Sequence, residues 1–499
     1  MDIHRYEVDK HSWAEEIVGV RAGKQYVDRL SRQTRQVWIR GRCVQDVTTE
    51  PTLAGALDTV RRLYDLQCSD EHRDLMTYEC PETGETFGAS YLRPTSQADI
   101  VKRRNTMRVW AEASFGMLGR SPDFLNTTLM TFADCANYFG EGRPEFAENI
   151  KRYYEYCRRE DLFLTHAIVP PQTDRSKSSA AQADEFMHLG LVEQRSDGIV
   201  VRGAKMLATH GPLADELMVY PSYVAPGDGR YALGFAIPCD APGLKFICRE
   251  PFLSGGESEW DHPLSTRFEE PDAIVIFDDV FVPADRVFLL GNPDHANRLA
   301  PGTNQRHFTG HQTAVRGLAK LRFTTGLAIA LTRSVKSDIF LHVQEQLGEL
   351  LGYLSLVEGA TLLAEQKADY TETGTLRPAY EPLQAIRYHL PKMYERAVAV
   401  TQVLGAGGLL LNPTEADFAS PIREDIDRYY QGAGIDAKTR IQISKLAWDA
   451  TGTQFAQRMV QYERYYAGDP IRLAAGSYLS YNADELLAYV TSAFSKELS

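Results

Sequence analysis

The chain lacks the positive charge that a nucleic-acid surface needs. Its 499 residues carry 54 Lys and Arg against 67 Asp and Glu, a formal net charge of −13. No basic block offsets that balance, so no nucleic-acid partner is expected. The first residues, MDIHRYEVDKHSWAEE, contain no apolar core of a secretory signal. No uninterrupted apolar run approaches the roughly 18 residues that span a bilayer. We therefore expect a cytoplasmic protein with no membrane partner.

Cysteine is scarce, and no two cysteines form a CxxC pair. The seven are Cys43, Cys68, Cys80, Cys135, Cys157, Cys239 and Cys248. Their spacing gives no support to a zinc or iron–sulfur site, so reduced structural thiols are expected. His307 and His311 are four residues apart, as on one helix face, but no acidic residue stands at the zincin spacing. No metal site is predicted.

A dinucleotide-binding loop is also missing. Gly405, Gly407 and Gly408 would need another glycine at position 410, where Leu410 stands, and they follow the helix-like run 393–404 rather than a strand. A Rossmann site is therefore excluded. Two interpretations stay open: glycines that cap a helix, or a path where a pyrophosphate or another backbone comes close. Any reduced cofactor must then come from elsewhere.

What is present is a pattern that changes twice along the chain. Residues 1–158 are predicted to be mainly helical, and SQAD at 96–99 matches a capping box that opens a helix. Residues 159–295 carry short β-branched runs between turns, which is typical of an antiparallel barrel or sandwich. Residues 296–499 return to helical periodicity and predict a bundle. This order predicts an α+β fold of the acyl-CoA dehydrogenase type, which holds a flavin between its sheet and its helices.

Two polar segments are candidates for chemistry. GRSPDF at 119–124 connects two helical segments. Either Ser121 or Asp123 caps the second helix, or Arg120 is aimed into a cleft where it would suit a phenolate or a reduced flavin ring.

The second candidate segment holds a lone histidine, His166, at a strand start. It is either a structural residue or a hydrogen-bond partner of a phenolic oxygen that helps to draw off the phenol proton. His311, at the opening of the predicted bundle, is a second candidate base.

Motifs spread over almost the whole chain resemble one family, the 4-hydroxyphenylacetate 3-monooxygenase oxygenase family. They are FGMLGRSPDF (115–124), THAIVPPQTDR (165–175), VRGAKMLAT (201–209), HPLSTRFEEPDAIVIFDDVFVP (262–283), FLHVQEQLGEL (340–350), ISKLAWDATGTQF (443–455) and YAGDP (466–470). The family also includes chlorophenol monooxygenases and oxygenases that tailor natural products. Taken in this order and at this spacing, the motifs are strongly specific.

The resemblance implies a flavin monooxygenase with the acyl-CoA dehydrogenase fold, usually a homotetramer. Such an enzyme receives reduced FAD by diffusion from a separate flavin reductase, binds O2, and ortho-hydroxylates a phenol through a C4a-hydroperoxyflavin.

Residue by residue, the resemblance implies that Arg120 and His166 bind the phenol and that Phe124 lines its site. A base histidine of the halophenol branch falls on or within a residue or two of His311. The residues that it implies for FAD are His166, Ala167, Ile168, Gln172, Thr173, Asp174, Arg175, Thr209, Gln344, Gly405, Gly407, Gly408, Tyr466, Ala467, Gly468 and Asp469. One departure is plain. The hydroxyphenylacetate enzymes have tyrosine where this chain has Phe124, so a phenol oxygen has one hydrogen-bond partner fewer.

Other functions stay open at this point. A halophenol monooxygenase that displaces a ring substituent fits the same motifs, as do tyrosine-derived and carrier-tethered phenols. An acyl-CoA dehydrogenase-like flavoenzyme would need a catalytic carboxylate, and Glu415, Glu424 and Asp425 lie in no recognisable motif. A scaffold without activity is the remaining alternative. The 4-hydroxybutyryl-CoA dehydratase branch is excluded because positions 115–120 contain no cysteine ligand.

Overall fold

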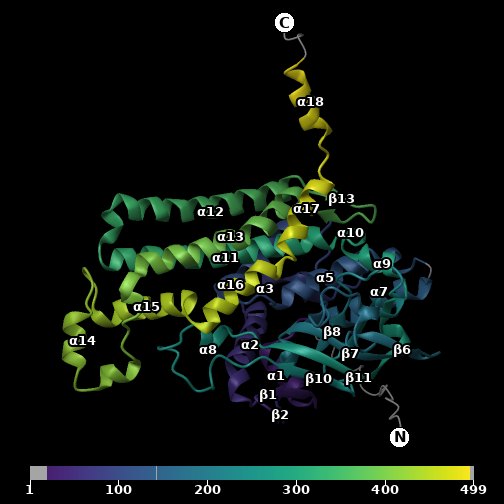
Figure 1. The fold of residues 1–499 in the computed structure, drawn as a ribbon, viewed down its shortest axis with the longest axis horizontal. Coiled ribbons are helices and arrows are strands. Elements are labelled where there is room, and N and C mark those ends of the chain that lie inside the picture. Colours follow the sequence, from purple (N-terminus) through teal and green to yellow (C-terminus); the bar gives the residue numbers. More distant parts are fainter. Residues whose placement is uncertain (1–18, 142, 495–499) are drawn as a thin grey trace.

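The computed structural model describes residues 19–141 and 143–494, and its elements follow the predicted order of helices, sheets and helices (Figure 1). The helices before the main sheets are α1 (Gly23–Ser31), α2 (Ala54–Cys68), α3 (Arg73–Met76), α4 (Gln97–Ala113), α5 (Pro122–Asp134), α6 (Ala136–Phe139) and α7 (Pro144–Glu160). The predicted capping box is confirmed. The Ser96 hydroxyl accepts from the Asp99 N–H, and the Asp99 carboxylate accepts from the Ser96 N–H.

Two larger sheets lie on one side of the molecule, beside the helix bundle (Figure 1). The six-stranded sheet has the order β2 (Arg42–Val44), β1 (Gln36–Ile39), β10 (Leu244–Cys248), β11 (Asp272–Pro283), β7 (Gly198–Thr209) and β6 (Gly190–Gln194). The four-stranded sheet has the order β12 (Val287–Leu290), β9 (Leu233–Pro238), β8 (Glu216–Val219) and β5 (Leu164–Ala167). The two small hairpins are β3 (Thr77–Glu79) with β4 (Thr86–Gly88), and β13 (Asp369–Tyr370) with β14 (Leu376–Arg377).

The pairing of the strands refines the predicted antiparallel unit. Most neighbours are antiparallel, but β1 pairs with β10 and β5 pairs with β8 in parallel. Strands β1 and β2 also come from the zone predicted to be helical and extend the six-stranded sheet. They are short, and their hydrophobic residues alternate over so few positions that a period of two is not visible in the sequence. The zone boundaries at 158 and 295 stay a prediction.

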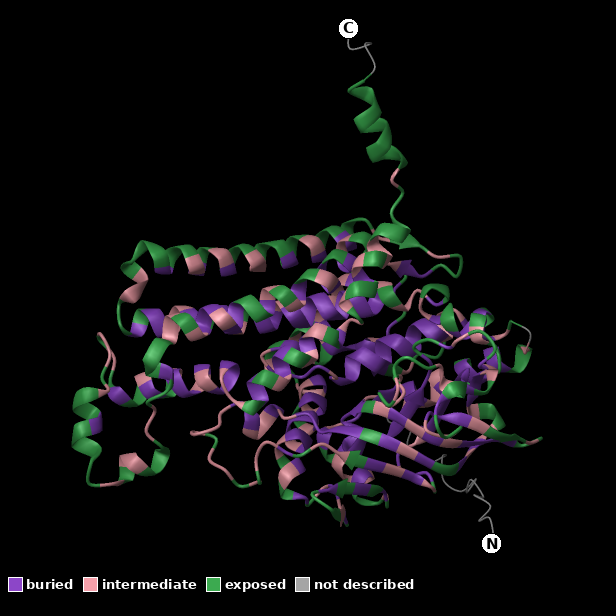
Figure 2. Ribbon diagram, viewed as in Figure 1, coloured by how far each residue is buried: buried purple, intermediate pink, exposed green. Residues whose placement is uncertain are grey.

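The C-terminal half is helical, as predicted. Its helices, with three short ones that precede it, are α8 (Ser265–Phe268), α9 (Pro293–Asn297), α10 (Leu299–Gly302), α11 (Gln305–Ser334), α12 (Leu341–Gln366), α13 (Tyr380–Gly405), α14 (Arg423–Tyr429), α15 (Ala437–Thr451), α16 (Gln454–Tyr466), α17 (Pro470–Ser480) and α18 (Asp484–Ser492). The long helices α11, α12 and α13 lie side by side, and α18 projects away from the body (Figure 1). Figure 2 shows α18 as fully exposed.

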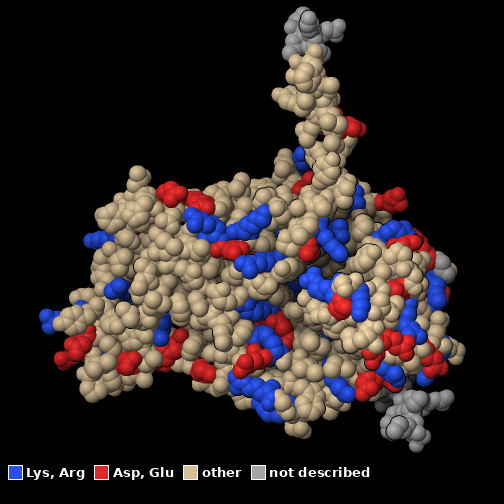
Figure 3. All heavy atoms as spheres, viewed as in Figure 1, with Lys and Arg blue, Asp and Glu red and all other residues tan. Residues whose placement is uncertain are grey.

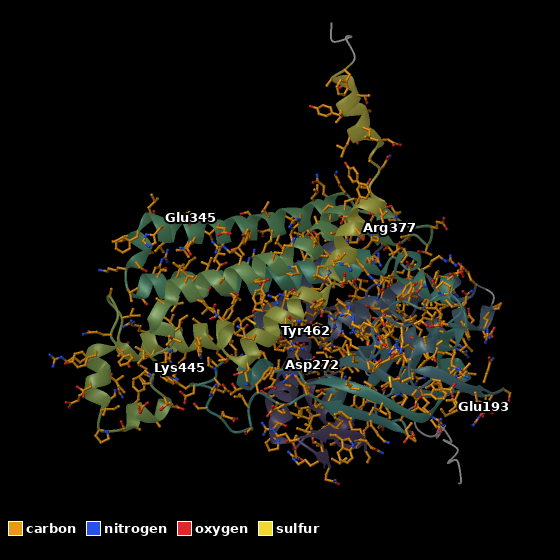
Figure 4. All side chains as sticks on the ribbon, viewed as in Figure 1. Glu193, Asp272, Glu345, Arg377, Lys445 and Tyr462 are labelled. Carbon is orange, nitrogen blue, oxygen red and sulfur yellow. The ribbon has the colours of Figure 1, made fainter. Side chains whose placement is uncertain are left out.

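Helix α16 places the site at the boundary between sheet and bundle. Tyr462 on α16 and Asp272 at the start of β11 lie near the centre of the molecule (Figure 4). One apolar core joins the sheets to the first helices and includes Phe124 and Tyr466, whereas a second core packs the bundle against α2, α4 and α8. A ligand bound beside Phe124 and Tyr466 would therefore touch both halves of the fold.

Candidate active site

The turn between α4 and α5 carries the first site residue, Arg120. Ser121 stands at the N-cap of α5 and Pro122 is its first residue. The predicted helix start is confirmed, although the Ser121 hydroxyl donates to the Asp123 carboxylate and accepts no hydrogen bond from the N–H groups of the first turn. Gly119 is required for close packing, because a Cβ there would lie 2.3 Å from the Tyr462 ring.

A buried carboxylate, Glu270, fixes the backbone of this turn. Its Oε1 accepts hydrogen bonds from the N–H groups of Gly119 and Arg120, each at 2.8 Å. Its Oε2 pairs with Arg458 on α16 at 2.5 Å. Burial opposes ionisation, but Arg458, His210 and the backbone donors outweigh it and hold the pKa of Glu270 well below its usual range. The turn is therefore held by a permanent negative charge.

The Arg120 guanidinium lies against aromatic rings. It is 4.0 Å from the Phe124 ring centroid, 4.3 Å from that of Tyr466 and 5.6 Å from that of Tyr462. Its Nε and Nη1 are buried without a hydrogen-bond partner, and within residues 19–141 and 143–494 no carboxylate forms an ion pair with it. Burial works against its charge, yet the neighbouring tyrosines and Glu270 raise the pKa above the ordinary arginine value. Unsatisfied buried donors are costly, so this cation is suited to an anionic ligand.

His166, on β5, is the neutral member of the site. Burial and the Arg120 charge push its pKa well below the ordinary histidine value. The Tyr220 hydroxyl lies 3.1 Å from its Nδ1. The Phe124 ring meets the imidazole edge-to-face, with centroids 5.9 Å apart. The structure thus brings together three residues that the sequence singled out: Arg120, Phe124 and His166.

Tyr466 connects this cluster to the bundle. Its hydroxyl is 2.8 Å from the Gly119 carbonyl oxygen and 2.9 Å from Oε1 of Gln312 on α11. Its ring also contacts a second guanidinium, that of Arg316, at 4.1 Å. Arg316 differs from Arg120 because it is bonded to the Glu463 carboxylate at 2.6 Å. Tyr466 is thereby held at both its ring and its hydroxyl.

Several residues expected to contact FAD converge on the same place. Thr209, at the end of β7, accepts a hydrogen bond from Thr165 through its carbonyl and one from Tyr462 at 3.3 Å through its hydroxyl. The segment 466–469 runs from the end of α16 to Asp469, which caps α17. The unpartnered donors of Arg120 and the aromatic walls fit a large, planar, polar ring system such as a flavin.

The loop 172–175 leaves β5 and lies mostly at the surface. Within it the Thr173 hydroxyl donates to Gln182, and the Asp174 carboxylate accepts from Ser176 and pairs with Lys177. Its exposed position suits the polar part of a dinucleotide more than its ring. Its role toward FAD stays a prediction.

Four other predicted FAD residues lie elsewhere on the surface. Gln344 is exposed and donates to a backbone carbonyl of its own neighbourhood. Gly405 ends α13, whereas a Cβ at Gly407 or Gly408 would enter open space. A cleft of 370 Å³ begins directly after Gly408 and is lined in part by Leu409, Leu410 and Trp448. In the part of the chain described, no contact links these residues to Arg120. Their role toward FAD stays a prediction.

The structure does not bring His311 into the cluster. Its Nε2 lies 2.7 Å from Glu365, which also pairs with Arg104. No described contact joins His311 to Arg120 or His166. The next residue on α11, Gln312, reaches Tyr466 instead, because consecutive helical residues point about 100° apart. The expectation that His311 is a base in this site therefore has no geometric support.

Three contributors to the site were missed in the sequence: Tyr220, Glu270 and Arg316. Glu270 belongs to a motif that carries the resemblance, and Tyr220 directly follows β8 in the zone for which strands were predicted. Both act through partners far away in the chain, which a local pattern does not show. No sequence motif marks Arg316 as a site residue; the sequence predicts only that it lies on a helix.

The fold and this cluster are those expected of one class of protein: a flavin-dependent enzyme whose site lies between a sheet unit and a helix bundle. Comparison with protein families makes this specific. The model for the 4-hydroxyphenylacetate 3-hydroxylase N terminal matches residues 22–289, and the model for its C terminal matches residues 296–494. The chain belongs to the 4-hydroxyphenylacetate 3-hydroxylase family, a family of flavin-dependent aromatic hydroxylases.

Individual relatives agree with this placement. The chain is 40% identical over 465 residues to the oxygenase component of 4-hydroxyphenylacetate 3-monooxygenase from Thermus thermophilus, covering 93% of this chain and 95% of the relative. It is 33% identical over 460 residues to the oxygenase component of 4-nitrophenol 2-monooxygenase from a Rhodococcus species, covering 90% and 86%. A crystal structure of a 4-hydroxyphenylacetate 3-monooxygenase oxygenase component with FAD and 4-hydroxyphenylacetate superposes with a TM-score of 0.91 at 38% identity, covering 95% and 98%. The predicted family, fold class and cofactor are confirmed.

Proposed function

We propose that this chain is the oxygenase component of a two-component monooxygenase that ortho-hydroxylates a phenolic compound with reduced FAD and O2. The observation that carries the proposal is the Arg120 guanidinium, which is buried among aromatic rings with two donors unused. A phenolate oxygen supplies the missing negative charge and accepts those donors. Relatives along nearly the whole chain act on 4-hydroxyphenylacetate and 4-nitrophenol.

The residues of the site would prepare a phenol for attack on an electrophilic oxygen. Reduced FAD, when bound near His166, Thr209 and the segment 466–469, supplies the electrons that activate O2. Arg120 holds the substrate oxygen as an anion, and the negative charge enriches the ortho carbon in electrons. The rings of Phe124 and Tyr466 keep water away, which limits wasteful release of H2O2.

Phe124 affects which phenolic substrate the site prefers. Its ring is 92% buried within the site and offers no hydroxyl to the substrate oxygen. The loss of one neutral hydrogen bond costs about 0.5–1.5 kcal/mol, which changes preference among phenols without abolishing binding. We therefore propose a phenol-type substrate in general, with simple, halogenated, tyrosine-derived and carrier-tethered phenols all to be tested. Displacement of a ring substituent has no added support, because His311 is engaged by Glu365.

The partners proposed are a flavin reductase, O2 and further copies of this chain. A reductase is needed because the sequence contains no nicotinamide-binding loop. It would deliver reduced FAD by diffusion in the cytoplasm. An acyl-CoA dehydrogenase-like oxidase, which needs no reductase, is the alternative, and reduction of bound FAD by an acyl-CoA would favour it.

A homotetramer would explain the apolar surface of the bundle. Exposed apolar residues gather on α12, α17 and α18: Leu351, Leu356, Leu362, Ile471, Tyr478, Leu479, Leu487 and Tyr489. Helix α12 is long and apolar enough to cross a membrane by length and composition, with 22% of its most apolar window buried. It packs beside α11 and α13, and Figure 3 shows few charges on the projecting α18 arm. Contact with another copy of the chain would cover these apolar faces, so they do not require a membrane.

A panel of phenols tests this function. The purified chain is given chemically reduced FAD, O2 and each phenol, and hydroxylated product is counted per O2 consumed. We expect coupled product from at least one phenol, and no oxidation of NADH by the chain alone. NADH oxidation without a reductase, or H2O2 as the sole product with every phenol, would contradict the proposal.

A further inference from the structure

A single guanidinium, that of Arg458 on α16, joins two carboxylates at the start of β11. Its Nε and Nη2 bond the Asp272 carboxylate at 3.0 and 2.6 Å, and its Nη1 bonds Oε2 of Glu270. The three side chains are enclosed, with exposed fractions of 10% for Arg458, 12% for Asp272 and 0% for Glu270. All three nitrogens of the guanidinium are therefore committed, in a geometry that a planar fork provides and an ammonium group does not.

The other oxygen of Glu270 holds the turn that carries Arg120. This oxygen, Oε1, accepts from the N–H groups of Gly119 and Arg120 and lies 3.4 Å from Nε2 of His210. Glu270 thus accepts on one oxygen from the turn and on the other from Arg458. Because the turn is bonded through its backbone, a displacement of Glu270 shifts the point from which the Arg120 side chain starts.

Asp272 leads in the other direction, to the strand of His166. Its Oδ1 accepts from the Thr209 hydroxyl at 2.8 Å, and the Thr209 carbonyl accepts from the Thr165 hydroxyl at 2.7 Å. Thr165 precedes His166 on β5, and successive side chains of a strand point to opposite faces. Thr165 therefore faces the Asp272 side, while the His166 ring meets that of Phe124.

We propose that Arg458 is a positioning residue of the phenol site: by holding Glu270 and Asp272 together, it fixes the spacing between the Arg120 turn and the β5 strand that carries His166. The inference rests on the proposed function and deepens it. In the described part of the chain no hydrogen bond joins Arg458 to Arg120 or His166, so it acts through its two carboxylates.

A ring in the wall of the site connects the two ends of this network again. The Arg458 guanidinium lies 3.9 Å from the ring centroid of Tyr462, and the Arg120 guanidinium lies 5.6 Å from the same centroid. The Tyr462 hydroxyl is 3.3 Å from Oγ1 of Thr209. Tyr462 therefore contacts Arg458, the arginine of the turn and the threonine bonded to Asp272, so movement of Arg458 would disturb the wall as well as the spacing.

The test separates position from charge. Its probe is 4-nitrophenol, whose anion absorbs visible light, and the pKa of the probe bound to the full-length chain is measured by absorbance titration. Arg458→Lys keeps the positive charge but not the fork. Glu270→Gln removes a negative charge beside the Arg120 turn, and its one amide oxygen can accept from the turn or from Arg458 but not from both. The matched control is Arg464→Lys on the same helix, because Arg464 is exposed and pairs with Glu395.

We expect the wild type to lower the pKa of bound nitrophenol below that of the free compound. Arg458→Lys and Glu270→Gln are each expected to raise it again by about one unit, a tenfold loss of preference for the anion, whereas Arg464→Lys leaves it unchanged. An effect of charge alone has another signature. It predicts no change in Arg458→Lys and a further fall in Glu270→Gln, because a negative charge near the phenolate has gone.

Asp272→Asn is a further variant that breaks the network from its other end, and it is expected to raise the bound pKa by a similar amount. Urea denaturation shows which variants are folded, and displacement by 4-hydroxyphenylacetate shows that the probe occupies the phenol site. If Arg458→Lys does not fold, Glu270→Gln and Asp272→Asn decide by the sign of their shifts.

An unchanged bound pKa in folded Arg458→Lys, or a lowered one in Glu270→Gln and Asp272→Asn, would overturn the inference alone. A wild-type chain that binds no phenol at all would instead contradict the proposed function and the inference together.

Discussion

The guanidinium groups of Arg120 and Arg316 both lie against the Tyr466 ring, but their charged partners differ. Arg316 is bonded to Glu463, which also pairs with Lys320 at 2.9 Å. Arg120 is partly buried as a residue and has no carboxylate partner among the described residues, and its Nε and Nη1 are buried and unsatisfied. The comparison teaches that a neutralised cation belongs to the framework, whereas an unpaired one is prepared for a ligand.

The largest expected effect is on stability and concerns the paired arginine. Arg316→Leu leaves Glu463 with Lys320 alone in a buried place, and we expect it to lower the free energy of unfolding by about 3–5 kcal/mol. Arg120→Leu removes an unpaired buried cation and is expected to be neutral or stabilising. Urea denaturation of both variants measures the difference. Equal destabilisation by the two substitutions would contradict the conclusion that Arg316 stabilises the fold and Arg120 does not.

The second effect is on chemistry and concerns the unpaired arginine. Arg120→Ala is expected to reduce hydroxylated product per O2 about tenfold or more, because a charge-assisted hydrogen bond to the phenolate is worth about 1.5–3 kcal/mol. Oxygen uptake with product analysis measures this coupling. The matched control is Arg62→Ala, which changes an exposed arginine paired with Asp58 on α2. If Arg120→Ala still formed as much hydroxylated product per O2 as the wild type, Arg120 would not be the group that holds the phenolate.

The third effect is a loss of stability at low pH, which we expect from the ion pairs of Glu463 with Arg316 and Lys320. Burial opposes ionisation of Glu463, but Arg316 and Lys320 outweigh it and lower its pKa to about 2. An acid whose pKa is lowered by folding stabilises the fold above its unfolded pKa, near 4.3, and this contribution is lost as the pH falls toward 2. Stability of the wild type, followed by denaturation between pH 6 and 2, should therefore fall more steeply than that of Glu463→Gln. Parallel curves would show that the carboxylate is not the sensitive group.

The fourth and smallest effect sharpens the identity of the ligand. Phe124→Tyr restores the hydroxyl that the hydroxyphenylacetate enzymes have, and should tighten binding of 4-hydroxyphenylacetate by roughly 0.5–1.5 kcal/mol. Calorimetric or spectroscopic titration gives the change in Kd, with Phe340→Tyr at an exposed position as the control. Weaker binding in Phe124→Tyr would mean that the site has no room or no acceptor for that hydroxyl.

The comparison also shows which parts of the molecule a sequence can predict. The capping box at Ser96, the long helices and the β-branched runs are local patterns, and each produced the predicted element. Arg120 and His166 were found because they stand in motifs that resemble a known family. The parallel pairing of β1 and of β5 was not foreseen, because strand partners are set by tertiary packing and not by periodicity.

What the sequence could not predict is how the site is supported. The Glu270 carboxylate meets Arg120 across 150 positions, and Tyr466 meets Gly119 across 347. Only the folded chain shows that Arg316 has a carboxylate while Arg120 has none. For the same reason His311 looked equivalent to His166 until its bond to Glu365 was seen.

The most direct test of the account is a single turnover under ¹⁸O₂. The chain, loaded with one equivalent of reduced FAD and a phenol that gave product in the panel, is mixed with ¹⁸O₂-saturated buffer, and the product is analysed by mass spectrometry. We expect one labelled oxygen in the new hydroxyl of the ring, and little labelled product from Arg120→Ala. Hydroxylated product without the label, or labelled H2O2 with unchanged phenol, would contradict it.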